Sequence, residues 1–136
     1  MALSENAILP KLFIIEDDPS IQMVLSKFLS KTFELNVFGS AMNALAYLQE
    51  GNIPDIIISD LHIPGLSGME LLKQLKSSGI FNSVPVVILS GEENSETRIL
   101  CLEAGADDFI VKPFSPRELE VRLKMILKRH GKVLAN

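Results

Sequence analysis

Short apolar runs alternate with helix-like periods along the whole chain, and no other feature constrains the fold as strongly. Five apolar runs predict strands, at residues 12–15, 35–38, 56–58, 84–89 and 109–111. Apolar residues also recur at helical spacing between these runs, most clearly at Ile21, Val24, Leu25, Phe28 and Leu29. Strands that are apolar throughout are typical of a parallel sheet with helices on both of its faces.

Capping residues predict where the helices begin and end. Asp18-Pro19 suits the cap and first turn of a helix, and Ser115-Pro116 has Glu118 at a capping-box distance. Glycines that follow helical segments should end four helices, at Gly51, Gly79, Gly105 and Gly131. We predict helices near 19–29, 41–48, 69–75, 95–104 and 116–130.

Five strand–helix units fill the chain, which contains no repeat or low-complexity segment. They predict an α/β fold, a (βα)5 flavodoxin-like three-layer sandwich around a five-stranded parallel sheet in the order 2-1-3-4-5. We place this domain at 11–131, with an N-terminal extension at 1–10 and a C-terminal tail at 132–136. In such sheets ligands bind at the carboxyl ends of the strands, where the strand order reverses.

Composition excludes several classes of function. Acidic residues outnumber basic ones by 17 to 13, so we expect no direct nucleic-acid contact by this domain. No stretch approaches the ~20 apolar residues that span a bilayer, and residues 1–10 lack the features of a signal peptide. The single Cys101 suits a reducing compartment and should be a buried helix residue. We therefore expect a cytoplasmic domain without membrane contact.

Acidic side chains follow the first and third predicted strands. Since these strands should be neighbours, Glu16, Asp17 and Asp60 should converge at one edge of the sheet. Three carboxylates this close repel one another unless a cation lies between them. Oxygen ligands favour Mg²⁺, or Mn²⁺, over zinc. Helix capping is the alternative role for these acids, and we assign it to Asp18.

Asp60 ends an otherwise apolar strand, where it could cap a turn before Pro64 or act as a nucleophile. Beside a divalent cation, a carboxylate can attack phosphorus and form an acyl phosphate. Ser90 and Lys112 follow the fourth and fifth strands, where a hydroxyl and an ammonium would stabilise the oxygens of a transferred phosphoryl group. Alone, Ser90 would more often be a turn residue and Lys112 a surface lysine. Together they predict phosphoryl transfer.

The ordered set of these motifs resembles the receiver domains of two-component response regulators, the CheY-like superfamily. It comprises Glu16-Asp17, residues 60–68, Ser90-Gly91 and residues 112–114, in matching order from about Lys11 to His130. The resemblance implies that Asp60 is the phosphoacceptor. It makes Asp17 a direct Mg²⁺ ligand, Glu16 a second acid acting through water, and the backbone carbonyl of His62 a further ligand.

The same resemblance assigns a switch. Ser90 matches the hydroxyl that moves onto the phosphoryl group, and Lys112 matches the cation beside it. Phe109 matches the aromatic residue that rotates on activation, and Pro113 matches a proline after a cis peptide bond. Some positions depart from the commonest pattern: Glu16 replaces Asp, Ser90 replaces Thr, and Gly91 replaces Ala. We expect these departures to change rates rather than the chemistry.

A receiver of this kind accepts its phosphoryl group from a sensor histidine kinase or a phosphotransfer protein. It assists its own phosphorylation and dephosphorylation, so we do not class it as an enzyme. The resemblance implies that phosphorylation switches the surface of the fourth helix, fifth strand and last helix to control an output partner or domain. Segments 102–109 and 112–119 are similar to receivers of winged-helix transcription regulators, which dimerise through this surface. We expect a phosphorylation-dependent homodimer, with an Asp108–Arg122 pair between chains, through Leu100, Asp108, Val121, Arg122 and Met125.

Three other functions fit the sequence less well. A phosphatase of the haloacid-dehalogenase type needs an acid two residues after its nucleophile, where this chain has His62. A flavin site needs a phosphate-binding loop after the first strand, where the acidic run 16–18 would repel phosphate. A module that has lost phosphorylation usually lacks one active-site residue, and this chain keeps the set.

Overall fold

The computed structural model describes residues 8–92 and 94–132. Most of the predicted N-terminal extension (1–7) and most of the predicted tail (133–136) therefore lie outside the described residues. Five parallel strands form one sheet in the order β2-β1-β3-β4-β5, as predicted. The strands are β1 (Lys11–Ile15), β2 (Glu34–Phe38), β3 (Ile56–Asp60), β4 (Val86–Ser90) and β5 (Asp108–Val111).

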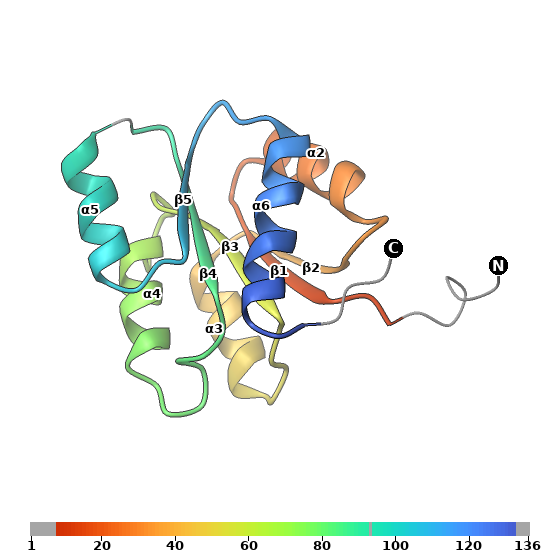
Figure 1. The fold of residues 1–136 in the computed structure, drawn as a ribbon. Coiled ribbons are helices and arrows are strands. Elements are labelled where there is room, and N and C mark those ends of the chain that lie inside the picture. Colours follow the sequence, from red (N-terminus) through yellow and green to blue (C-terminus); the bar gives the residue numbers. More distant parts are fainter. Residues whose placement is uncertain (1–7, 93, 133–136) are drawn as a thin grey trace, which may run out of the picture.

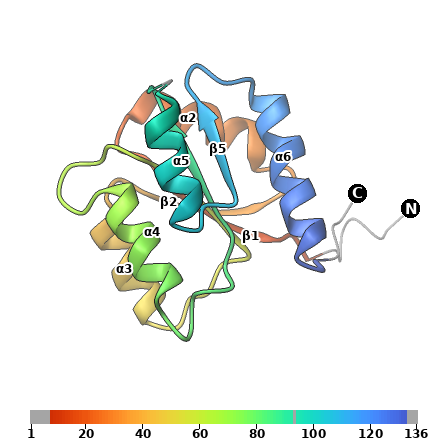
Figure 2. The same cartoon turned by 60° about the vertical axis from the view of Figure 1, so that its left-hand side comes forward.

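Helices cover both faces of this sheet, which gives the predicted three layers (Figures 1 and 2). One face carries α2 (Pro19–Leu29) and α6 (Pro116–Arg129). The other carries α3 (Ala41–Gln49), α4 (Gly68–Lys76) and α5 (Ser95–Glu103). Strand side chains alternate between the two cores, so Phe13 and Ile15 pack under one layer and Leu12 and Ile14 under the other. This alternation explains why the strands are apolar throughout.

Most predicted helix ends agree with the structure. Asp18 caps α2 by accepting a hydrogen bond from the Ser20 amide at 2.8 Å. Gly51, Gly105 and Gly131 have the positive φ angles that end helices. The prediction for Gly79 was wrong, because α4 already ends at Lys76. There the Ser77 hydroxyl donates to the Gln74 carbonyl at 3.2 Å, which the Ser78 amide would use to continue the helix, and the Ser78 amide donates to the Leu75 carbonyl at 3.1 Å instead.

Two further predictions need correction. β4 begins at Val86 rather than residue 84, because Pro85 has no amide to donate to a neighbouring strand. On α2, Leu25 and Leu29 are buried, but Val24 and Phe28 are 48% and 38% exposed. The apolar stripe of α2 is therefore wider than the area that the sheet can cover. No helix among the described residues is both long and apolar enough to cross a membrane.

Asp107 forms hydrogen bonds with both backbone groups of Val86, the first residue of β4, and its removal should destabilise the fold. Its carboxylate accepts a hydrogen bond from the Val86 amide at 2.8 Å, and its own amide donates to the Val86 carbonyl at 2.8 Å. We expect Asp107→Ala to lower the free energy of unfolding by about 1–3 kcal/mol, because Val86 is buried and its amide would lose this partner. Urea denaturation measures the change. Asp107→Asn keeps an acceptor and should lose less; equal losses for both variants would contradict this role.

Candidate functional site

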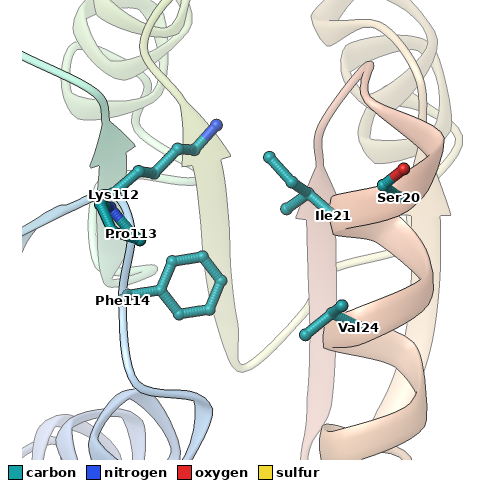
Figure 3. Close-up of a pocket in the computed structure, with 6 residues that line it drawn as sticks. All are labelled: Ser20, Ile21, Val24, Lys112, Pro113 and Phe114. Carbon is teal, nitrogen blue, oxygen red and sulfur yellow. The ribbon is translucent and has the colours of Figure 1, made fainter.

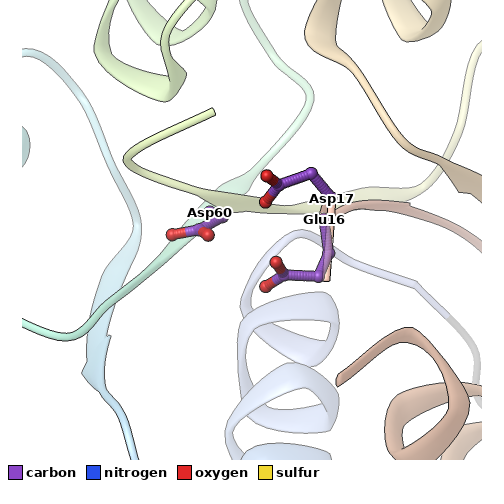
Figure 4. Close-up of side chains that lie close together, drawn as sticks. All are labelled: Glu16, Asp17 and Asp60. Carbon is purple, nitrogen blue, oxygen red and sulfur yellow. The ribbon is translucent and has the colours of Figure 1, made fainter. Parts of the chain in front are cut away.

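Three carboxylates meet where β1 and β3 end. Glu16 and Asp17 directly follow β1, Asp60 ends β3, and the two strands are paired, with Ile15 opposite Ser59. One oxygen from each carboxylate lies within 4.8 Å of the others (Figure 4). Asp17 is exposed, whereas the other two are buried. The structure thus brings together the three acids that the sequence predicted to converge.

Lys112 extends from the end of β5 to the two buried acids. Its Nζ donates to Glu16 Oε1 at 2.9 Å and to Asp60 Oδ2 at 3.1 Å. The Lys112 amide donates to the Ser90 carbonyl at 2.7 Å, which fixes where the side chain starts. An ammonium between two buried carboxylates offsets part of their mutual repulsion. Lys112 is therefore the resident counter-ion of this site in the described structure.

Burial and charge act in opposite directions on these groups. Burial raises the pKa of the Glu16 carboxyl, with a smaller contribution from Asp60, although the hydrogen bond from Lys112 opposes the change. Burial lowers the pKa of the Lys112 ammonium, but its hydrogen bonds to Glu16 and Asp60 outweigh that effect, so its pKa is raised. Lys112 is consequently held in its charged form. The site keeps a permanent cation beside its acids.

The donor set fits a small divalent cation. All three side chains offer oxygen, which is what Mg²⁺ prefers. The three oxygens lie within 4.8 Å of one another, close enough for one cation to lie among them with water in the remaining positions. Glu16 is fixed in place, because its Oε2 accepts from the Asp18 amide at 3.1 Å and its own amide donates to the Phe38 carbonyl at 3.0 Å. Asp17 lies on the open side.

The predicted switch residues are both buried. Ser90 ends β4, is 0% exposed, and accepts a hydrogen bond on Oγ from the Glu92 amide at 3.0 Å. Phe109 packs in the core on the same face of the sheet as Cys101 and Ile88, so this structure holds it in the inward position. Cys101 is buried as predicted, and burial raises the pKa of its thiol. The Lys112–Pro113 peptide bond is cis, also as predicted.

The predicted interface residues lie on α5, β5 and α6. Leu100, Val121 and Met125 are each about half exposed, and Ile99 and Leu102 beside them are similarly open. Arg122 forms its salt bridge with Asp108 of the same chain at 3.0 Å, because β5 and α6 are neighbours. The resemblance assigned this pair to two chains. A dimer that paired Asp108 with Arg122 between chains would first have to break this salt bridge within each chain.

Two contacts at the site were not predicted from the sequence. Glu92 accepts hydrogen bonds from the side chains of His62 and Thr97, and these bonds lower the pKa of its carboxyl. Gly68, the first residue of α4, lies directly against the backbone of Asp60. The first feature joins residues 30 positions apart and leaves no local signal. The second could have been suspected, because a close backbone approach is a common reason for glycine.

Comparisons with known proteins agree with this geometry. A family model described as the response regulator receiver domain matches residues 12–124. The transcriptional regulatory protein BaeR of Escherichia coli is 33% identical over 130 residues, which cover 95% of this chain and 52% of BaeR. The sensory transduction protein RegX3 of Mycolicibacterium smegmatis is 38% identical over 117 residues, which cover 85% of this chain and 50% of RegX3. The chain thus spans about half the length of either relative.

Solved structures show the same likeness. The receiver domain of the Francisella response regulator 1452 superposes with a TM-score of 0.80 at 36% identity, covering 88% of this chain and 98% of that one. Such domains are signalling modules whose general function is to accept a phosphoryl group, and they bind Mg²⁺ at an acidic pocket. The strand order, the acidic edge and the matched residues lead to one assignment. This chain belongs to the response regulator receiver domain family.

Proposed function

We propose that Asp60 accepts a phosphoryl group from a sensor histidine kinase or a phosphotransfer protein, in a reaction that requires Mg²⁺. The observation that carries this proposal is the convergence of Glu16, Asp17 and Asp60 within 4.8 Å beside the Lys112 ammonium. The domain occupies residues 11–131 and works in the cytoplasm. It takes part in one transfer at a time and assists its own dephosphorylation, so it is not an enzyme that acts on a separate substrate.

Each side chain has a distinct role in this reaction. A carboxylate oxygen of Asp60 attacks phosphorus, the bond from phosphorus to the donor imidazole nitrogen breaks, and the imidazole keeps the electron pair. Asp17, Asp60 and the His62 carbonyl would hold Mg²⁺ directly and Glu16 through water; Mn²⁺ could replace it. The ion supplies charge neutralisation at the phosphoryl oxygens. Lys112 and Ser90 then donate hydrogen bonds to those oxygens.

An apolar pocket beside Lys112 supports docking of a protein donor. It is lined on one side by Ser20, Ile21 and Val24 of α2 and on the other by residues 112–114 (Figure 3). Exposed apolar surface that continues up to a reacting group marks an interaction site. A helix of the donor that covered Ile21 and Val24 would bring its histidine toward Asp60. Docking of the donor would then explain why part of the apolar face of α2 is exposed.

The output surface is formed by α5, β5 and α6. A phosphoryl group adds roughly two negative charges and would draw Ser90 and Lys112 toward it, which changes the surroundings of Phe109. Near-complete switching needs about 5 kcal/mol of differential stabilisation, which a few charge-assisted hydrogen bonds can provide. The new surface controls an output partner or domain, and we propose that one partner is a second copy of this chain.

Phosphoryl incorporation tests the central proposal. The protein is incubated with acetyl phosphate, with Mg²⁺ or with excess EDTA, and its intact mass is measured. One phosphoryl group should be gained only with Mg²⁺, and peptide mapping after rapid quenching should place it on the segment that contains Asp60. Incorporation that persists in EDTA, or that maps elsewhere, would overturn the proposal.

Asp17→Asn should weaken Mg²⁺ binding by at least about tenfold without destabilising the fold. A change that only reorients a ligand typically weakens binding about 10- to 100-fold, and loss of a ligand should not have a smaller effect. Asp17 is exposed, so its removal should leave the core unchanged. Isothermal titration calorimetry measures the affinity. Asp18→Asn is the matched control: it removes the neighbouring charge from a residue that caps α2, and an equal loss there would contradict the assignment.

Dimerisation gives a separate prediction. We expect the phosphoryl mimic beryllofluoride, with Mg²⁺, to shift the wild type from a monomer to a dimer in size-exclusion chromatography with light scattering. Val121→Asp should abolish the shift, because it places a charge on the exposed apolar surface of α6. Met23→Asp, on the exposed side of α2, should dimerise normally. An unchanged mass for the wild type would count against the homodimer.

A further inference from the structure

Glu92 joins three segments on which the switch depends. Its amide donates to Ser90 Oγ at 3.0 Å, just after the end of β4. Its carboxylate is bonded to the imidazole of His62, which follows β3. The same carboxylate accepts a hydrogen bond from Thr97 Oγ1, in the first turns of α5, at 3.1 Å. Glu92 therefore links the Ser90 hydroxyl to two side chains outside its own segment.

The backbone is held in place at two points of this network, His62 and Ser90. His62 lies between Leu61 and Ile63, which are both buried, and the Leu61 amide donates to the Leu89 carbonyl at 2.9 Å. The backbone of Ser90 is held by the bond from the Lys112 amide to its carbonyl at 2.7 Å. The parts that can rearrange are then the Ser90 side chain and the segment Gly91-Glu92. Gly91 adds no packing, because a Cβ there would meet no heavy atom within 4 Å.

In the described structure the Ser90 hydroxyl is bonded to the Glu92 amide and not to the Asp60 carboxylate, so donation to a group on Asp60 would need a rearrangement. Its side chain is fully buried, whereas the Asp60 carboxylate, on which the group would form, retains some exposure at the edge of the sheet. The hydroxyl must turn outward, and the Glu92 amide must either follow it or release it. If the amide follows, the bonds from the Glu92 carboxylate to His62 and Thr97 are strained or broken. If Glu92 stays in place, held by those two bonds, the hydroxyl loses its bond from the amide.

We propose that Glu92 is a positioning residue that holds the Ser90 hydroxyl in its resting place, and that its bonds to His62 and Thr97 set how readily the hydroxyl is released. This inference rests on the proposed function, because release matters only if Ser90 donates to a group on Asp60. Removing one anchoring bond should shift the equilibrium toward the phosphorylated arrangement. One net hydrogen bond changes an equilibrium constant by a factor of about five.

The decisive variant is Thr97→Val, which removes one hydroxyl without changing shape or charge. We expect it to bind beryllofluoride about fivefold more tightly than the wild type at saturating Mg²⁺, by isothermal titration calorimetry. Glu92→Ala removes both anchors and should tighten binding at least as much, although part of that gain would come from the lost negative charge. Glu96→Gln, an equal loss of charge on an exposed residue in the first turn of α5, measures the charge effect alone.

Two further measurements separate positioning from a structural role. Mg²⁺ affinity without beryllofluoride should stay within about twofold of wild type in Thr97→Val, because the metal site is untouched. In a Ser90→Ala background, Thr97→Val should no longer tighten beryllofluoride binding, because no hydroxyl remains to be released. A gain that persists without Ser90, or a parallel change in Mg²⁺ affinity, would overturn the inference.

The outcomes also separate this inference from the proposed function. If the wild type fails to bind beryllofluoride, or if Asp60→Asn binds it equally well, the phosphoacceptor assignment fails. If the wild type binds and Asp60→Asn does not, the assignment holds and the anchors can be judged. Affinities within twofold of wild type for both Thr97→Val and Glu92→Ala would then overturn the role of Glu92.

Discussion

Asp60→Asn is expected to abolish phosphoryl incorporation from acetyl phosphate, at every concentration of Mg²⁺. The carboxylate is both the proposed nucleophile and one of three oxygens gathered within 4.8 Å. An amide of nearly the same size cannot form a stable acyl phosphate, and it is a weaker ligand for a hard cation. Since the reaction has one acceptor, the loss should be complete rather than partial. Intact-mass measurement after incubation shows the result directly.

The same variant should remain folded, which makes the result interpretable. Asp60 lies beside the buried Glu16, and their mutual repulsion contributes to the raised pKa of the Glu16 carboxyl. Removing one of two like charges relieves that repulsion, but it also weakens the ion pair with Lys112. Because the amide oxygen can still accept from Lys112, which also keeps its bond to Glu16, the free energy of unfolding should change little. The matched control is Asp55→Asn. Asp55 directly precedes β3, at the end far from the site, and its carboxylate accepts a hydrogen bond from the Lys11 amide at 2.7 Å. This variant should incorporate a full phosphoryl group. Incorporation into Asp60→Asn would mean that another residue accepts it.

One physical reason allowed both the sheet and the position of the site at the carboxyl ends of its strands to be predicted from the sequence. Parallel strands buried on both faces must be apolar, so a polar residue at a strand end is easily recognised, as with Asp60 after Ile56 to Ile58. Strand order then brings the ends of β1 and β3 together. Asp17, Asp60 and Lys112 could all be selected by this argument before any coordinates were known.

The remaining features depend on contacts that periodicity does not encode. Val24 and Phe28 fit the apolar stripe of α2, yet the sheet does not reach them. α4 ends at Lys76, where the Ser77 hydroxyl contacts the Gln74 carbonyl, rather than at the nearby Gly79. The contact of Lys112 with Glu16 spans 96 positions, and sequence analysis gave Glu16 only a role in metal binding. Such pairings follow from the packed structure, where burial makes each unpaired charge unfavourable.

Gly68 shows how closely the fold and the site are connected. A Cβ at this position would lie 2.3 Å from the carbonyl oxygen of Asp60 and 2.9 Å from the Cα of Leu61. Neither backbone atom can easily move, because Asp60 is paired with Leu89 and the Leu61 amide donates to the Leu89 carbonyl at 2.9 Å. The Gly68 amide in turn donates to the Leu61 carbonyl at 3.0 Å, which holds α4 against β3.

Gly68→Ala should therefore lower the free energy of unfolding by about 3 kcal/mol, the upper range for forcing extra volume into a packed region. Urea denaturation measures the loss. Any folded protein that remains should incorporate less phosphoryl, because relief of the contact displaces the backbone of Asp60. Gly79→Ala is the control, since a Cβ there meets no heavy atom within 4 Å and its φ is not in the left-handed region. That variant should be unchanged or more stable by up to about 1 kcal/mol. A similar stability for both variants would show that α4 can withdraw from β3, and that the close contact does not position Asp60.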